Sequence, residues 1–229
     1  MIIPAVVAFQ VATYTLPSVE LPRYVREESD IVWYPVFGST ISDLRAQMHE
    51  NGPHDDAGAY AGYTRNRTYW HISWRESGGT CAVTDVAVTT YDTVTLPMWD
   101  PPPRADSAAV AEWGRFLTML GRHEEGHRDI AIAGAGDIAR ALALLSPQAS
   151  CADLAAAANA QGQVILASIA ERQRQYDAET QHGVRRGTGL EDLSTRRPPL
   201  SPLVGVATAA ILAIGVAWVC KVAVQRSSR

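Results

Sequence analysis

The segment His123-Glu124-Glu125-Gly126-His127 restricts the fold of this chain more than any other part of its sequence. Residues four apart on an α-helix are neighbours on one face, so a helix through this segment brings the two imidazoles together. The pattern H-E-x-x-H is typical of helices that bind zinc through both histidines and use the glutamate as a general base. The sequence therefore predicts a helix with a zinc site on one face.

The residues before this segment indicate that the same face is buried. Apolar side chains recur at helical spacing, and the stripe that they form continues into the motif: Trp113, Phe116, Leu117, Leu120, His123, Glu124 and His127. Two histidines and an acid on a buried face are costly unless they have partners. A metal ion would be such a partner. The alternative interpretation is a pair of core histidines satisfied by hydrogen bonds.

A catalytic zinc site also needs a third protein ligand and an open position. The extended metzincin pattern requires glycine at position 130 and histidine at position 133, where this chain has Ile130 and Ala133. That class is therefore excluded. Glu171 would suit a scheme with a glutamate ligand, and Asp177 one with an aspartate ligand.

The two halves of the chain differ in pattern. The first half alternates β-branched and aromatic residues, which predicts strands over 31–37, 68–74 and 81–90, with a short helix over 39–50 capped by Ser39 or Thr40. The second half is helical over about 107–145, capped by Asp106 or Ser107 and broken near Gly134 and Gly136, and again over 151–178. We expect an α+β, zincin-like fold: a small antiparallel sheet packed by the motif helix and a second long helix.

Composition and cysteines indicate the number of domains, the class of partner and the redox compartment. The chain has 229 residues, 47% of them hydrophobic, which suffices for one catalytic domain. A net charge of -4 and the lack of a basic stripe argue against nucleic acid as a partner. Cys220 lies in an apolar tail, so Cys81 and Cys151 are either a disulfide, which implies an oxidising compartment, or two separate buried thiols.

Both ends of the chain are apolar. Residues 203–220 carry no charge, contain Trp218 and precede a short basic tail over 221–229, which predicts a transmembrane helix after an Arg/Pro linker over 191–202. Residues 1–30 form an apolar lead, within which 1–12 are either an atypical signal peptide or a first strand. We expect a single-pass membrane protein whose catalytic domain is extracytoplasmic.

Several segments resemble one family when taken in order. They are Val36-Phe37-Gly38, Gly52-Pro53, Thr68-Tyr69-Trp70, Cys81, Leu96-Pro97-Met98-Trp99, the H-E-E-G-H segment and Tyr176-Asp177-Ala178-Glu179-Thr180-Gln181-His182-Gly183. Over residues 31–190 the chain is similar to a bacterial family of predicted secreted zinc-dependent proteases, catalogued as a domain of unknown function. The apolar lead and tail lie outside the resemblance.

The last of these segments, residues 176–183, is the second motif of this family, and the resemblance implies that it contains the third ligand. It favours His182, followed by Asp177 as either a ligand or a partner that orients an imidazole. Tyr176 either donates a hydrogen bond to a developing oxyanion or is a core aromatic of its helix.

The expected activity is that of a membrane-anchored zinc metallopeptidase acting on a peptide or protein substrate, with Glu124 as base. An amidase for cell-wall peptide would use the same centre. The alternative is a non-catalytic envelope protein whose metal site is structural and whose surface recruits a partner.

Overall fold

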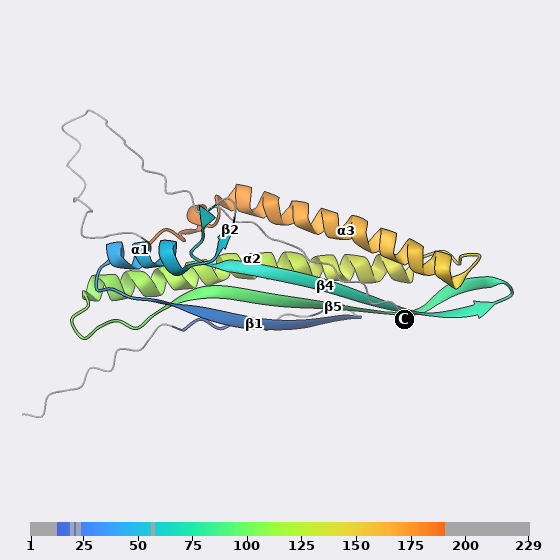
Figure 1. The fold of residues 1–229 in the computed structure, drawn as a ribbon, viewed down its shortest axis with the longest axis horizontal. Coiled ribbons are helices and arrows are strands. Elements are labelled where there is room, and N and C mark those ends of the chain that lie inside the picture. Colours follow the sequence, from blue (N-terminus) through green and yellow to red (C-terminus); the bar gives the residue numbers. More distant parts are fainter. Residues whose placement is uncertain (1–12, 19–20, 22–23, 56–57, 191–229) are drawn as a thin grey trace, which may run out of the picture.

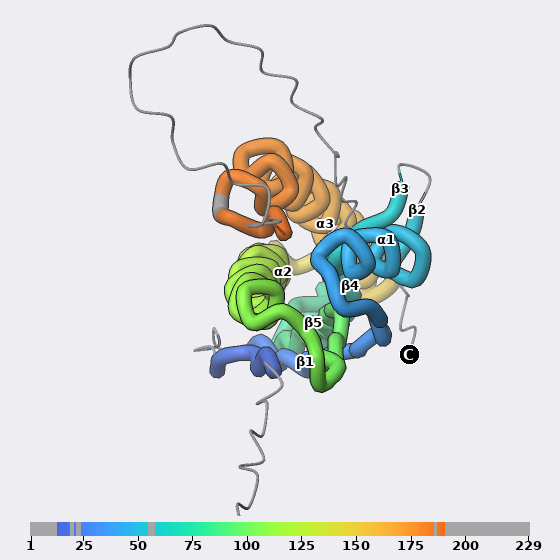
Figure 2. Tube along the Cα trace, turned by 90° about the vertical axis from the view of Figure 1, so that its left-hand side faces the viewer, coloured from blue at the N-terminus to red at the C-terminus, as the bar shows by residue number. Residues whose placement is uncertain are grey.

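One long helix, α2 (Ser107–Ala143), organises the fold. The computed structural model describes residues 13–18, 21, 24–55 and 58–190. In it α2 lies between a three-stranded sheet and a second long helix, α3 (Cys151–Thr180) (Figures 1 and 2). The predicted α+β class is confirmed, with both predicted long helices on the same side of the sheet.

The sheet has the strand order β1-β5-β4, with β1 at Val25–Val36, β4 at Tyr63–Ser77 and β5 at Thr80–Trp99. Strands β4 and β5 form an antiparallel hairpin whose turn contains Gly78 and Gly79, both at positive φ. Strand β1 pairs with β5 in parallel. The sheet is therefore mixed, and the prediction of an antiparallel sheet is wrong for β1, because side-chain alternation carries no information on strand direction.

Short elements complete the chain order. Helix α1 spans Ile41–Asn51 and is capped by Thr40, whose side chain accepts from the backbone of Asp43 while Asp43 bonds back to the cap. The predicted helix at 39–50 and its cap are thus confirmed. The remaining elements are β2 (His54–Asp55), β3 (Gly58–Ala59) and a 3₁₀ turn, η1 (Val184–Arg186).

Helix α2 begins after Asp106, whose carboxylate accepts from the backbone of Ala108, and it is continuous. The predicted break near Gly134 and Gly136 is wrong. Both glycines are buried, and a Cβ at Gly134 would collide with Ile169 of α3. Gly134 therefore allows α3 to approach α2 closely, and the helix continues through both glycines.

Two apolar clusters fill the interior at opposite ends of α2. The first joins α1 and the start of α2 to the sheet around Leu44, Trp99 and Phe116. The second joins the end of α2 to α3 and the hairpin around Ile138 and Leu154. Buried polar residues lie between them: Thr64, Asn66, Thr68, Thr90, Asp92, His123, Glu124, His127, Arg128, Gln173 and Asp177. We call this set the polar belt.

The chain before residue 31 contributes to the domain. Strand β1 begins at Val25 rather than Ile31, and Tyr14 and Leu16 pack against the first apolar cluster. The predicted signal at 1–12, the linker at 191–202, the transmembrane helix at 203–220 and the tail at 221–229 all lie outside the described residues. None of the described helices could span a membrane.

A disulfide joins Cys81, at the start of β5, to Cys151, at the start of α3. A backbone pairing between Cys81 and Gln148 lies beside it. The predicted pairing of the two cysteines is therefore confirmed, and it ties the hairpin to the helix that carries part of the second motif.

Replacing both cysteines, C81S/C151S, should lower the free energy of unfolding by about 4 kcal/mol, because a crosslink across 70 residues restricts the unfolded chain. Chemical denaturation of wild type and variant measures this. Reductant should destabilise the wild type by a similar amount and leave the variant unchanged. Equal stability of the two proteins would contradict the prediction.

Candidate metal centre

Three potential ligands converge where α3 crosses the middle of α2. They are His123 and His127 on α2 and Asp177 on α3, and one ligand atom from each lies within 4.8 Å of the others. Oδ1 of Asp177 lies 2.9 Å from Nε2 of His127 and 3.4 Å from Nε2 of His123. The helical spacing of the histidines therefore produces the convergence that the motif predicts.

The donor set suits zinc. Two imidazole nitrogens and one carboxylate oxygen are ligands that Zn²⁺ accepts, and three protein ligands leave one tetrahedral position open. All three side chains are almost fully buried, so the cluster lies within the protein and not on an exposed acidic surface. Thiolates are absent from the set, because the two cysteines of the described domain are joined to each other.

The charges of this cluster are interdependent. Burial is the main cause that lowers the pKa of His123, which favours the neutral, metal-binding form of its ring. Burial would raise the pKa of Asp177, but its contacts with His123 and His127 outweigh burial and hold that pKa below its usual value. Both directions favour the protonation states that bind a metal.

Glu124 lies beside the cluster and is completely buried. Its Oε2 accepts a hydrogen bond of 2.7 Å from the hydroxyl of Thr64 on β4. Its Oε1 is buried and has no hydrogen-bond partner among the described residues. Burial raises the pKa of Glu124 well above its usual value, and the nearby charge of Asp177 adds to this effect. One oxygen of a proton-accepting carboxylate is thus fixed and the other remains available.

A hydrogen-bonded chain orients His127. Its Nδ1 lies 2.5 Å from Oε1 of Gln173 on α3, whose amide nitrogen donates to the carbonyl of His127 at 2.8 Å and to Asn66 at 3.2 Å. Asn66 donates in turn to Asp92, which Thr90 also contacts. Because Nδ1 is held by an amide oxygen, Nε2 is directed towards Asp177.

Tyr176 holds the motif from the α3 side. Its ring stacks on His123 with centroids 5.1 Å apart and meets His127 edge to face at 4.9 Å. Its hydroxyl donates to the carbonyl of His123 at 3.1 Å. A Cβ at Gly126 would collide with that hydroxyl, which explains a glycine inside the motif. In this arrangement the hydroxyl is bound to backbone, and the predicted oxyanion contact stays a prediction.

His182 lies at the rim of the same site. Its Nδ1 is 3.9 Å from Oδ1 of Asp177, and its side chain is 31% exposed. It follows the end of α3, where Gln181 and His182 both have positive φ, and Gly183 then brings the backbone against His123. The structure therefore places Asp177 inside the cluster of three ligand atoms and His182 beside it.

Glu171 and the remaining histidines lie elsewhere. Glu171 is exposed and binds Arg174, so the scheme with a glutamate ligand has no support in the geometry. His71 is exposed on β4, and His49 and His54 are exposed near the end of α1.

Sequence reasoning missed the residues that support the site from the sheet and from α3. Thr64, Asn66 and Thr68 alternate along β4 on the face that packs against α2. A row of buried polar residues in a strand could have indicated a polar centre behind it. Gln173, four residues before Asp177, carries no local signal of its function.

A family model described as a bacterial protein of unknown function, DUF922, matches residues 31–183. The chain belongs to this family. The match runs from β1 through the end of α3 and so includes all three clustered ligands. No curated protein and no solved structure matches the chain. Membership of a bacterial family of unknown function is thereby established.

The variant D177N should weaken zinc binding by more than about 100-fold, because an amide is a poor substitute for a carboxylate ligand. H182A, at the rim, should change the affinity by less than about tenfold. Competition with a chromogenic chelator measures both, with thermal unfolding as the check on folding. Loss of zinc from H182A but not from D177N would reverse the assignment of the third ligand.

Gln173 offers a second test, because its amide oxygen orients His127. Q173A should weaken zinc binding about 10- to 100-fold. Q173E keeps an acceptor opposite Nδ1 and should recover part of the loss. The matched control is Q175A, on the exposed side of α3, where Gln175 donates to Glu171. If Q173A and Q175A bind zinc equally well, Gln173 does not orient the ligand.

Proposed function

We propose that this protein is a zinc-dependent metallopeptidase, with Zn²⁺ held by His123, His127 and Asp177 and with Glu124 as general base. The observation that carries this proposal is the buried oxygen of Glu124 beside an open three-ligand donor set. A purely structural zinc site is normally closed by four protein ligands and has no need of an adjacent base.

Zinc, when bound, supplies a Lewis acid that polarises a carbonyl and acidifies water. The chain's own residues accept and return the proton and hold the two imidazoles. Thr64 fixes Oε2 of Glu124, so Oε1 is the atom that accepts the proton of the attacking water. Burial raises the pKa of Glu124, so the acquired proton is held until it passes to the leaving amine. Tyr176 and Gln173 keep the two imidazoles in place.

An extended peptide is the substrate that the sheet favours. Strand β4 has β5 on one side only, and no further described strand pairs with its other edge. An edge strand can bind an extended peptide through backbone hydrogen bonds. Thr64 belongs to β4 and contacts Glu124, so a peptide aligned along this edge would pass the base.

The setting that we propose is the bacterial envelope. The Cys81–Cys151 disulfide indicates an oxidising compartment. The uncharged segment 203–220 would anchor the chain in the membrane, with the metal centre on the extracytoplasmic side. Cell-wall peptide is one substrate that this location would supply.

The variant E124Q tests catalysis separately from metal binding. It should retain about one zinc per chain and lose at least about 1,000-fold in the rate of peptide cleavage, because the base is removed while the ligands remain. The matched control is E125Q, which changes the neighbouring, partly exposed glutamate of the same motif and should stay active. Cleavage of a quenched fluorescent peptide library, with and without a chelator, measures the rate.

A different pattern would favour the non-catalytic alternative. If the zinc-loaded wild type cleaves no peptide of the library, the site is structural or binds a partner. If E124Q cleaves as fast as E125Q, Glu124 is not the base. The zinc content of each variant shows that the comparison concerns catalysis and not metal loss.

A further inference from the structure

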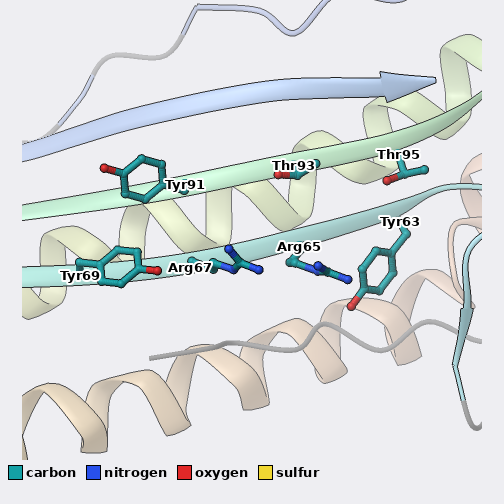
Figure 3. Close-up of a pocket in the computed structure, with 7 residues that line it drawn as sticks. All are labelled: Tyr63, Arg65, Arg67, Tyr69, Tyr91, Thr93 and Thr95. Carbon is teal, nitrogen blue, oxygen red and sulfur yellow. The ribbon is translucent and has the colours of Figure 1, made fainter. Parts of the chain in front are cut away.

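The sheet has a second face, opposite α2, that the metal ligands do not use. Along β4, residues with even numbers from Thr64 to Thr68 point into the polar belt, and the odd-numbered residues point to the other side. On that side lies a groove whose lining residues come from β4 and β5 (Figure 3): Tyr63, Arg65, Arg67, Tyr69, Tyr91, Thr93 and Thr95. We call it the Tyr/Arg groove.

The groove contains two positively charged side chains on β4, Arg65 and Arg67. Arg65 and Arg67 are both exposed, and neither forms an ion pair with any residue in the described ranges. They are two residues apart on one strand, so their backbones are separated by about 7 Å. Guanidinium groups recognise carboxylates and phosphates with two parallel hydrogen bonds. Two of them in a row fit a ligand with repeated negative groups.

Aromatic residues flank this pair. Tyr63 and Tyr69 lie before and after the arginines on β4, about 20 Å apart along the strand. Tyr91 on β5 is 39% exposed and meets Tyr69 edge to face at 5.6 Å. A tyrosine offers an apolar ring and a hydroxyl. Sugar rings pack their C–H faces on such rings and hydrogen-bond to such hydroxyls.

The floor of the groove, unlike the free edge of β4, offers no backbone groups for an added peptide strand. Tyr63 is opposite Thr95, Arg65 opposite Thr93, and Arg67 opposite Tyr91 in the β4–β5 ladder. The backbone groups between these pairs are already used, so a peptide cannot be added here as a further strand. No aliphatic side chain lines the groove within the described residues. Recognition therefore depends on hydroxyl, guanidinium and aromatic groups.

Acidic residues limit the groove on one side. Glu28 and Asp30 of β1 are exposed and stand in register with Tyr91 and Thr93. They lie one further strand from the arginines, about 10 Å across the sheet. An anionic chain is attracted along β4 and repelled from β1, so its axis is set parallel to the strands.

From this geometry we propose that the Tyr/Arg groove binds an acidic glycan, a chain of sugars with carboxylate groups, along the face of the sheet away from the metal centre. The ligand would be held by salt bridges to Arg65 and Arg67 and by ring stacking on the flanking tyrosines. The site uses none of the metal ligands. It therefore gives the protein a binding activity that is independent of hydrolysis.

The test uses the full chain and oligogalacturonate, a glycan with one carboxylate per sugar, titrated by calorimetry. The wild type should bind it, and R65A/R67A should weaken binding at least about tenfold. Y63A/Y69A should also weaken it, because stacking is lost. The matched control R75A/R104A removes two exposed arginines outside the groove and should bind as the wild type does. Higher salt should weaken the interaction.

Two further ligands separate the alternatives. Uncharged dextran oligomers should not bind measurably, and poly-glutamate of equal charge should bind at least about tenfold more weakly than oligogalacturonate. Equal binding of poly-glutamate would show a groove that recognises charge alone and would overturn the glycan assignment. So would no binding of oligogalacturonate, or equal binding by R65A/R67A and R75A/R104A. Circular dichroism confirms that each variant is folded.

Discussion

The contact on which the structure depends is that of one carboxylate oxygen, Oδ1 of Asp177, with the Nε2 atoms of His123 and His127. It exists only because α3 lies closely along α2. Small residues permit that approach: Gly126 receives Tyr176, and Gly134 receives Ile169. The disulfide fixes the far end of α3 to the hairpin. The candidate metal centre is thus a consequence of helix packing, and a Cβ at either glycine would collide with a side chain of α3.

Buried polar residues, the polar belt, surround the candidate metal centre in the interior of the domain. The polar belt interrupts the core between two apolar clusters. Buried polar groups destabilise a fold unless they are satisfied. Gln173 connects Asn66 to His127, and Asn66 donates to Asp92, while Arg128 binds Glu27 and the carbonyl of Pro17. Burial raises the pKa of Asp92 to about 6, against the hydrogen bond from Asn66. A site that needed only stability would contain apolar residues here.

The sequence predicted the site better than the sheet. The two imidazoles, the buried stripe of α2 and the caps at Thr40 and Asp106 follow from local spacing and are present. The direction of β1 did not follow, because parallel and antiparallel strands have the same alternation. Gly134 was interpreted as a helix breaker because a sequence does not reveal tertiary contacts such as the one with α3. His182 and Asp177 could not be ranked, because the turn after α3 decides which of them points inward.

X-ray absorption at the zinc edge of the zinc-loaded wild-type protein distinguishes an open three-ligand centre from a closed one. We expect a four-coordinate ion with two imidazole nitrogens at about 2.0 Å, one carboxylate oxygen and one solvent oxygen, without sulfur. The D177N variant should lose the carboxylate oxygen from this shell. A third imidazole in the wild type, or a closed shell of four protein ligands, would contradict the open centre on which the proposed hydrolysis depends.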